Sequence, residues 1–225
     1  MEKFLGILCA GGKGKRLGMI TNYISKPFVP VYDRPAFLYP LKQMECSKYI
    51  DEIIILTREE NNEKFASLGY ETIIQDDRVV RDMFSGLSFI KKKKKTNRHF
   101  VLMPCDNISR INIDAVINLF LSKPEIDIAF CIKVIRDRKK LRDMGVYDPR
   151  RKMVYYKPKL PPSPYGVLAP YVVRNTLKIP PVSDAQVLNR SNFIVYDYRG
   201  FWFDIGDVES LFNCTKFLRG LYAKR

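Results

Sequence analysis

A glycine-rich segment with interspersed cations, ILCAGGKGKRLG at Ile7–Gly18, is the first stretch of this sequence that could take part in chemistry. A short apolar run leads into it, and Gly11, Gly12 and Gly14 then alternate with basic residues. Glycines let the backbone approach a phosphate and aim N–H groups at it, while Arg16 offers a fork of donors to phosphate oxygens. The pattern favours polyphosphate binding; a plain strand-to-helix turn with solvated cations is the alternative.

Two common phosphate-binding fingerprints do not fit this segment. A dinucleotide motif G-x-G-x-x-G that starts at Gly12 would need glycine where Leu17 stands. A Walker A loop, G-x-x-x-x-G-K-[ST], is satisfied neither at Gly12-Lys13 nor at Gly14-Lys15. What remains is G-G-x-G-x-R-L directly after a predicted buried strand.

Elements of the α/β type are predicted to position this loop. Short apolar runs typical of buried parallel strands lie at 4–9, 52–56, 71–74 and 100–103, separated by helical-length segments at 36–47, 59–68 and 79–90. Strands that alternate with helices predict a Rossmann-like, mostly parallel sheet with helices on both faces and ligands at the carboxyl ends of the strands. The glycine-rich segment follows such a strand end.

The second half of the chain has a different order of predicted elements, with more strands and fewer helices. After a predicted helix at 112–121, strand-like segments follow at 126–135, 145–148, 153–157 and 166–173, with prolines gathered at 158–164. This pattern predicts a mixed sheet with a smaller β-rich insertion that faces the substrate, closed by a strand, a turn and a helix between Phe193 and Arg219. We expect a single domain over 1–225, with a nucleotide-binding half at 1–125 and an acceptor-binding half at 126–225.

Five blocks of sequence resemble the sugar-1-phosphate nucleotidyltransferase family. Their residues are most similar to those of glucose-1-phosphate thymidylyltransferases. In the family's order, they are AGGKGKRL at Ala10–Leu17 with SKPFVPVYDRPAFLYPL at Ser25–Leu41, then Gln75, PCDN at Pro104–Asn107, Gly145-Val146 with Tyr155-Tyr156-Lys157-Pro158, and RGFWFDIGDVESL at Arg199–Leu211. The resemblance implies the nucleotide-diphospho-sugar transferase fold and a reaction of EC 2.7.7 type. An NTP and a sugar 1-phosphate would then form an NDP-sugar with release of pyrophosphate.

The resemblance also implies roles for the residues that match the family's nucleotide motifs. The residues expected to bind the nucleotide are Ala10, Gly11, Gly12, Gly14 and Gln75. Arg16 and Lys26 would stabilise the triphosphate and the charge that develops at the α-phosphorus. These are expectations from similarity rather than from spacing.

On the acceptor and metal side, the resemblance makes Lys157 a catalytic residue that grips the sugar phosphate, with Gly145 and Tyr156 beside the substrate. Asp106 and Asp204 would hold the cofactor Mg²⁺, because hard carboxylate oxygens are what Mg²⁺ prefers alongside phosphates and waters. No general base is needed, since a phosphate monoester is already an anion near neutral pH.

The departures from the family pattern concentrate around the sugar and the base. Tyr156-Lys157-Pro158 replaces E-K-P, so the carboxylate that would accept hydrogen bonds from sugar hydroxyls is missing. The family's base-side glycine after Gln75 is replaced by Asp77, Arg78 or Val79, and its Tyr-Gly becomes Met144-Gly145. The expectation is dTTP or UTP with a hexose 1-phosphate. Two alternatives stay open: CTP with phosphocholine, held in an aromatic cage, and a catalytically weak regulator that binds nucleotide sugars.

Composition limits the other classes of function that the chain could have. The net charge of the 225 residues is +15 and Lys91–Lys95 is a lysine run, but no nucleic-acid motif or interleaved aromatic residue accompanies it, so a solvated helix end is favoured over nucleic-acid binding. The apolar runs are too short for a membrane helix, and the five cysteines form no C-x-x-C pair. We expect a cytoplasmic protein. The short segment after the D-x-G block predicts a monomer or homodimer.

Overall fold

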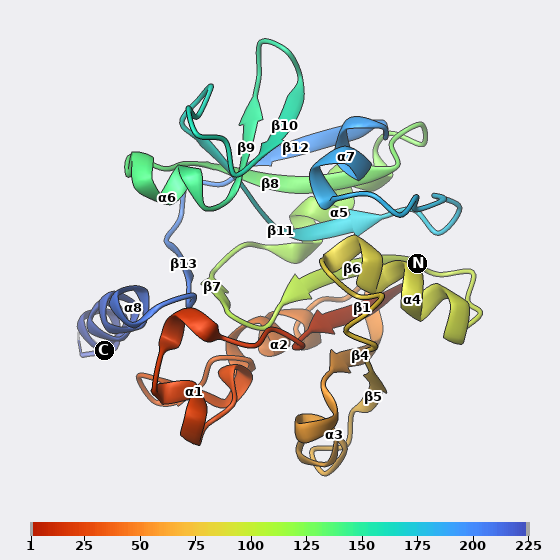
Figure 1. Cartoon of the computed structure of the whole chain (residues 1–225). Helices are drawn as coiled ribbons and strands as arrows, with labels where there is room; N and C mark the ends of the chain where they lie inside the picture. Colours follow the sequence, from red (N-terminus) through yellow and green to blue (C-terminus); the bar gives the residue numbers. More distant parts are fainter. Residues whose placement is uncertain (1, 224–225) are drawn as a thin grey trace.

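The computed structural model describes residues 2–223 and shows a large sheet with helices packed on both faces (Figure 1). The elements of the first half are β1 (Phe4–Cys9), α1 (Ile20–Tyr23), β2 (Pro30–Val31), β3 (Arg34–Pro35), α2 (Leu38–Glu45), β4 (Ile50–Thr57), α3 (Glu59–Ala66), β5 (Glu71–Ile74), α4 (Met83–Lys93), β6 (His99–Pro104), β7 (Asn107–Ser109) and α5 (Ile113–Leu121). Those of the second half are β8 (Ile128–Val134), α6 (Arg138–Arg142), β9 (Gly145–Asp148), β10 (Met153–Tyr156), β11 (Tyr165–Val173), α7 (Asp184–Asn189), β12 (Phe193–Asp197), β13 (Trp202–Asp204) and α8 (Val208–Tyr222).

The strands of the first half run parallel in the order β5-β4-β1-β6. β1 lies between β4 and β6, so the strand order reverses at this point of the sheet. The carboxyl ends of β1 and β6 lie side by side, with Cys9 opposite Pro104. Open α/β sheets bind their ligands at such a switch point. The predicted α/β class and the position of the glycine-rich segment after a buried strand are confirmed.

β11 joins this parallel half to the rest of the sheet. It runs antiparallel to β6, β8 and β9, and β9 continues into the β9–β10 hairpin, whereas β12 lies parallel to β8. In Figure 1 these strands form the upper part of the molecule, above the strands of the first half. The predicted change from a parallel to a mixed arrangement is confirmed.

Alternate side chains of β1 explain why helices cover both faces. Phe4 and Leu8 pack on the face that α2 and α5 cover, whereas Leu5 and Ile7 pack on the face that α4 and α7 cover. Adjacent side chains of a strand point to opposite faces, so a strand apolar throughout must be buried on both. Each fully buried Leu, Ile or Phe contributes roughly 1.5–3 kcal/mol. The central strand thereby fixes the place of the loop that follows it.

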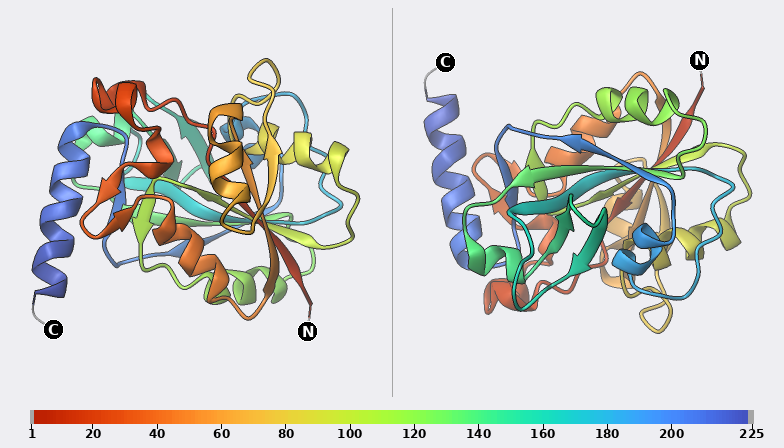
Figure 2. Two further views of the ribbon diagram at one scale, coloured as in Figure 1. Left: turned by 90° about the horizontal axis from the view of Figure 1, so that it is seen from below. Right: turned by 90° about the horizontal axis from the view of Figure 1, so that it is seen from above.

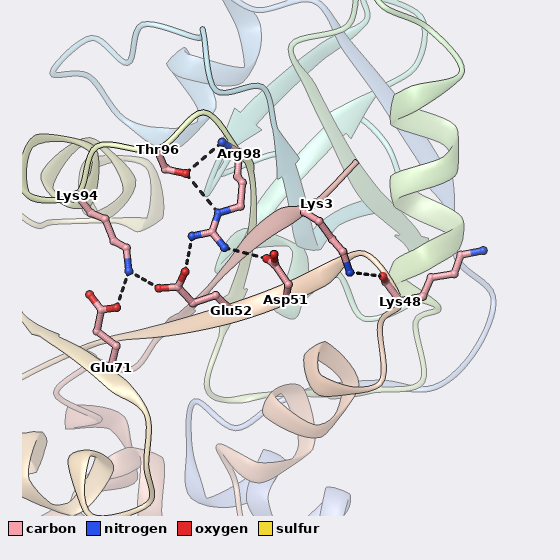
Figure 3. A network of polar contacts seen from close by, with 8 residues as sticks. All are labelled: Lys3, Lys48, Asp51, Glu52, Glu71, Lys94, Thr96 and Arg98. Carbon is pink, nitrogen blue, oxygen red and sulfur yellow. Dashed lines mark hydrogen bonds and ion pairs between the residues drawn. The ribbon is translucent and has the colours of Figure 1, made fainter. Parts of the chain in front are cut away.

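The lysine run continues the end of α4 and is partly tied to the sheet. Lys91 donates to the backbone carbonyls of Asn175 and Leu177. Figure 3 shows Lys94 between Glu52 and Glu71, with Arg98 bonded to Asp51 and Glu52. Lys92, Lys93 and Lys95 are exposed, as the prediction of a solvated helix end requires. Lys91 therefore ties α4 to the segment that follows β11, and Lys94 ties the end of the helix to β4 and β5.

The last elements of the chain return to the first half. β13 pairs with β7 in a separate antiparallel ladder, and α8 packs Cys214 and Leu218 against a small core that includes Leu17 and Val31. Figure 2 shows α8 at one end of the molecule, beside α1. Within residues 2–223 no helix combines the length and the apolar character needed to cross a bilayer.

Candidate functional site

The glycine-rich loop is held tightly at both ends. Ala10 is buried and its N–H donates to the carbonyl of Leu56 at 2.8 Å, which continues the pairing of β1 with β4. Gly14 has a φ of 67°, in the left-handed region that favours glycine. A Cβ on Gly14 would also lie 2.8 Å from the Thr21 side chain. The loop conformation thus depends on glycine at this position.

Gln75, predicted to bind the nucleotide, lies directly against Gly11. A Cβ on Gly11 would fall 1.7 Å from Gln75 Oε1, which is impossible without moving the glutamine. The Gln75 amide donates to Asp77 Oδ1 at 2.6 Å and to the Gly11 carbonyl at 3.4 Å. The loop after β1 and the loop after β5 are therefore in contact through this side chain.

Replacing Gly11 by Ala is expected to displace Gln75 and weaken nucleotide binding by about tenfold or more, since an Å-scale misplacement of a binding group is costly. Isothermal titration of the variant with Mg²⁺ and an NTP measures this. Gly220→Ala is the matched control, because a Cβ there meets nothing within 4 Å. Equal affinities of the Gly11 variant and the parent would contradict the packing argument.

A cavity of about 550 Å³ opens where these loops meet. Five of the predicted residues line it, namely Gly11, Gly12, Lys26, Gln75 and Asp106. Its other polar lining consists of Lys13, Arg58, Asp77, Arg81 and Asp82, of which Arg58, Arg81 and Asp82 were not singled out from the sequence. Leu56, Val80 and Met83 supply apolar surface. We call this space the glycine-loop cavity.

The Lys26 side chain packs against the loop and forms an ion pair with Asp106. Its side chain passes 3.7 Å from the position of a Cβ on Gly12, and both partners of the pair are mostly buried. Burial by itself opposes a charge on Lys26, but the Asp106 carboxylate outweighs it and raises the pKa of Lys26 above its ordinary value. Burial likewise opposes a charge on Asp106, yet attraction to Lys26 holds the pKa of Asp106 below its ordinary value.

Asp204 reaches Asp106 through the ladder of β7 and β13. Asp204 stands opposite Asn107, and the Ile205 N–H donates to the Asp106 carbonyl at 2.9 Å. The Trp202 indole N–H also donates to Asn107 Oδ1 at 3.0 Å, which fixes the ladder. Burial, followed by the charge of Asp106, raises the pKa of Asp204 to about 7. Two carboxylates that are almost a hundred residues apart in the sequence therefore form one acidic pair.

The chemistry of this pair fits a magnesium ion. Both donors are carboxylates, and among residues 2–223 no cluster of three His, Cys, Asp or Glu side chains is placed to hold a metal. Mg²⁺ is commonly held by one or two carboxylates, with substrate phosphates and waters as its other ligands.

Arg16 lies beside Asp204 and, unlike Lys26, does not line the glycine-loop cavity. Its guanidinium rests on the D-x-G turn, because a Cβ on Gly206 would lie 2.6 Å from Arg16 Nη2. Arg16, Met144 and Asp204 line a second cavity of about 310 Å³, the Arg16 cavity. The two predicted cations therefore flank the two predicted carboxylates.

The predicted acceptor-side residues gather at the end of the β9–β10 hairpin. Gly145 stands opposite Tyr156 in the ladder, and the Lys157 N–H donates to the Met144 carbonyl at 3.1 Å. Lys157 is exposed, and its Nζ lies 5.2 Å from the centre of the Tyr156 ring. In the described part of the chain, Gly145, Tyr156 and Lys157 line neither cavity. Their link to the site is Met144, which lines the Arg16 cavity.

Comparison with known proteins identifies the family of the chain. The family model described as nucleotidyl transferase matches residues 5–172, which include β1, the glycine-rich loop, Lys26, Asp106 and the β9–β10 hairpin. The chain belongs to the nucleotidyl transferase family. Asp204 and α8 lie beyond the matched residues.

Two curated relatives match shorter segments. The glucose-1-phosphate thymidylyltransferase of Neisseria meningitidis is 43% identical over 63 residues, which are 28% of this chain and 22% of that protein. A molybdenum cofactor guanylyltransferase of Thermococcus gammatolerans is 35% identical over 72 residues, 32% of this chain and 35% of that protein. This nucleotidyl transferase thus matches well under two thirds of the length of either relative.

Solved structures share the fold over nearly the whole chain. A protein from Bacillus anthracis described as a glucose-1-phosphate thymidylyltransferase superposes with a TM-score of 0.81 at 22% identity, over 96% of this chain and 95% of that one. A UDP-glucose pyrophosphorylase from Acinetobacter baumannii gives a TM-score of 0.76 at 19% identity, over 99% and 94%. The predicted fold is confirmed.

Proposed function

We propose that this nucleotidyl transferase joins an NTP to a sugar 1-phosphate. An oxygen of the sugar phosphate attacks the α-phosphorus, the bond from that phosphorus to the bridging oxygen breaks, and pyrophosphate leaves. The observation that carries this proposal is the acidic pair of Asp106 and Asp204, flanked by Lys26 and Arg16 at the open end of the glycine-rich loop. The names of the relatives support transfer to a sugar phosphate.

The position of each residue suggests its role in the proposed reaction. The backbone of Gly11 and Gly12 faces the glycine-loop cavity, where its N–H groups would hold the triphosphate. Lys26 is buried and charged, so it would neutralise phosphate oxygens without the motion that an exposed lysine requires. Arg16 approaches from the other cavity and would stabilise charge as the α-phosphorus changes geometry. Asp106 and Asp204 would hold Mg²⁺, which supplies further charge neutralisation when bound.

One screen tests this function directly. Pyrophosphate release is measured with GTP, ATP, CTP, UTP and dTTP, each against a panel of sugar 1-phosphates and against phosphocholine. Turnover with a hexose 1-phosphate supports the proposal. Turnover with CTP and phosphocholine alone would replace the acceptor, and nucleotide-sugar binding with no turnover in any combination would make the protein a regulator.

Lys157→Ala is expected to raise the KM for the sugar 1-phosphate by about tenfold while kcat falls little, because a contact made equally in ground and transition states acts on binding. Its exposed position on the hairpin, away from the acidic pair, favours this role over one in the chemical step. Lys159→Ala, two residues along the same loop, is the matched control. A fall in kcat with an unchanged KM would contradict the assignment.

A further inference from the structure

The start of α4 forms part of the wall of the glycine-loop cavity. The glycine-rich loop, Lys26 and Asp106 would hold the triphosphate, which leaves the wall at the start of α4 for the base of a bound nucleotide. Asp82, the residue that caps α4, lines the cavity there. A base at this wall would meet the groups around Asp82.

The first N–H groups of α4 are already taken. Ser85 N–H donates to Asp82 Oδ1 at 2.9 Å, and Phe84 N–H donates to Asp184 Oδ1, also at 2.9 Å. Met83 N–H makes a longer bond of 3.4 Å to Asp184 Oδ2. A helix start usually offers such donors to a ligand's carbonyl or phosphate oxygens. Here protein carboxylates occupy them, so this wall offers the base an acceptor instead.

The two carboxyl groups at this wall do not both need to be charged. Burial, followed by the nearby charge of Asp82, raises the pKa of Asp184 to about 7. Asp82 is the member of the pair that lines the cavity. A carboxylate has about four lone-pair sites, so the bonds of Asp82 to the Ser85 N–H and to the Asp184 carboxyl group still leave capacity for a ligand.

The four kinds of base differ in how their edges meet such an acceptor. Uracil and thymine present one N–H between two carbonyl oxygens, and both oxygens would be repelled by a carboxylate. Cytosine and adenine present an amino group beside a ring nitrogen that is itself an acceptor. Guanine alone presents a ring N–H next to an amino group, a fork of donors that matches a carboxylate as a guanidinium does.

We propose that Asp82 makes the glycine-loop cavity select guanine, so that GTP is the nucleotide donor of the reaction proposed above. Arg81, whose side chain has no ion-pair partner within residues 2–223, lines the same cavity and would donate to the guanine carbonyl oxygen. Leu56, Val80 and Met83 give the ring faces apolar contact. The motifs resemble those of thymidylyltransferases and by themselves favour dTTP or UTP. Asp82 is the residue that favours GTP instead.

Binding is measured by isothermal titration with GTP, ITP, ATP, CTP, UTP and dTTP in Mg²⁺, without an acceptor. ITP lacks only the amino group of guanine. We expect GTP to bind at least about tenfold more tightly than UTP or dTTP and several-fold more tightly than ITP, as for loss of one good base contact. Asp82→Asn, which retains a good helix cap, should bring these affinities together.

Asp127→Asn is the matched control, because Asp127 also accepts a backbone N–H, from Asn192, and lines neither the glycine-loop cavity nor the Arg16 cavity. It should leave the order of affinities unchanged, and melting temperatures of both variants verify that they fold. UTP or dTTP binding the parent as tightly as GTP would overturn the proposal. So would an Asp82→Asn variant that keeps the full preference for GTP over ITP.

This inference rests on the proposed function but can fail separately from it. Selective GTP binding without pyrophosphate release from any acceptor would remove the transferase function and leave the base assignment standing. Turnover that is fastest with UTP or dTTP would do the opposite.

Discussion

Replacing Asp106 by Asn is expected to lower turnover by roughly a thousandfold, as for loss of one strong preorganised charge contact in other active sites. The neutral amide is a poorer ligand for Mg²⁺ than a carboxylate. It also leaves Lys26 without its buried partner, so the position of that cation changes as well. Initial rates of pyrophosphate release at saturating NTP and sugar phosphate measure the effect.

Asp204→Asn should give a comparable loss for a different reason. It removes a ligand without releasing Lys26, and it relieves the repulsion between two buried carboxyl groups, so the protein should be at least as resistant to heat as the parent. Asp148→Asn serves as the control, since Asp148 is also a buried acid but lines neither cavity. EDTA should abolish turnover of the parent. Parent-like rates in both site variants would end the assignment of the metal to this pair.

Arg16→Ala is expected to reduce kcat by about a hundredfold while the affinity for the NTP changes no more than about threefold, since an interaction made mainly in the transition state acts on the rate. Arg16 lines the Arg16 cavity and not the glycine-loop cavity, so little ground-state binding of the NTP depends on it. Single-turnover rates separate this step from product release.

Two further variants sharpen the test of Arg16. Arg16→Lys should restore only part of the rate, because lysine keeps the charge but loses the planar fork of donors. Lys15→Ala removes the neighbouring exposed cation, which lines neither cavity, and should behave as the parent does. A large rise in the KM for the NTP with an unchanged kcat in Arg16→Ala would make Arg16 a binding residue.

The parallel half of the fold was predictable because its strands are apolar on both faces. The predicted strand at 71–74 coincides with β5, and those at 52–56 and 100–103 lie within β4 and β6. The helix predicted from Val79 begins at Met83, because Asp82 caps it in an Asp-x-x-Ser box that could have been recognised in the sequence. The insertion of β11 between β6 and β9 could not, since pairing between distant strands leaves no local pattern.

The same limit applies to the site. Family motifs placed Lys26, Asp106 and Asp204 in one site, and the structure brings the three together, although their roles stay predictions. The bond from Phe84 to Asp184 joins residues that lie a hundred positions apart, so only the packing of α7 against α4 reveals it. For the same reason, the acceptor character of the α4 wall was not predictable.

The ladder of β7 and β13 also has a consequence for the growing chain on the ribosome. Domains begin to fold from the N-terminus during synthesis, and contacts between distant residues form late. β5, β4, β1 and β6 can pair before the second half exists, but Asp204 reaches Asp106 only when β13 returns to β7. A nascent chain that has not yet extended through Asp204 therefore holds the glycine-rich loop and one carboxylate, and it acquires the complete acidic pair among its last steps of folding.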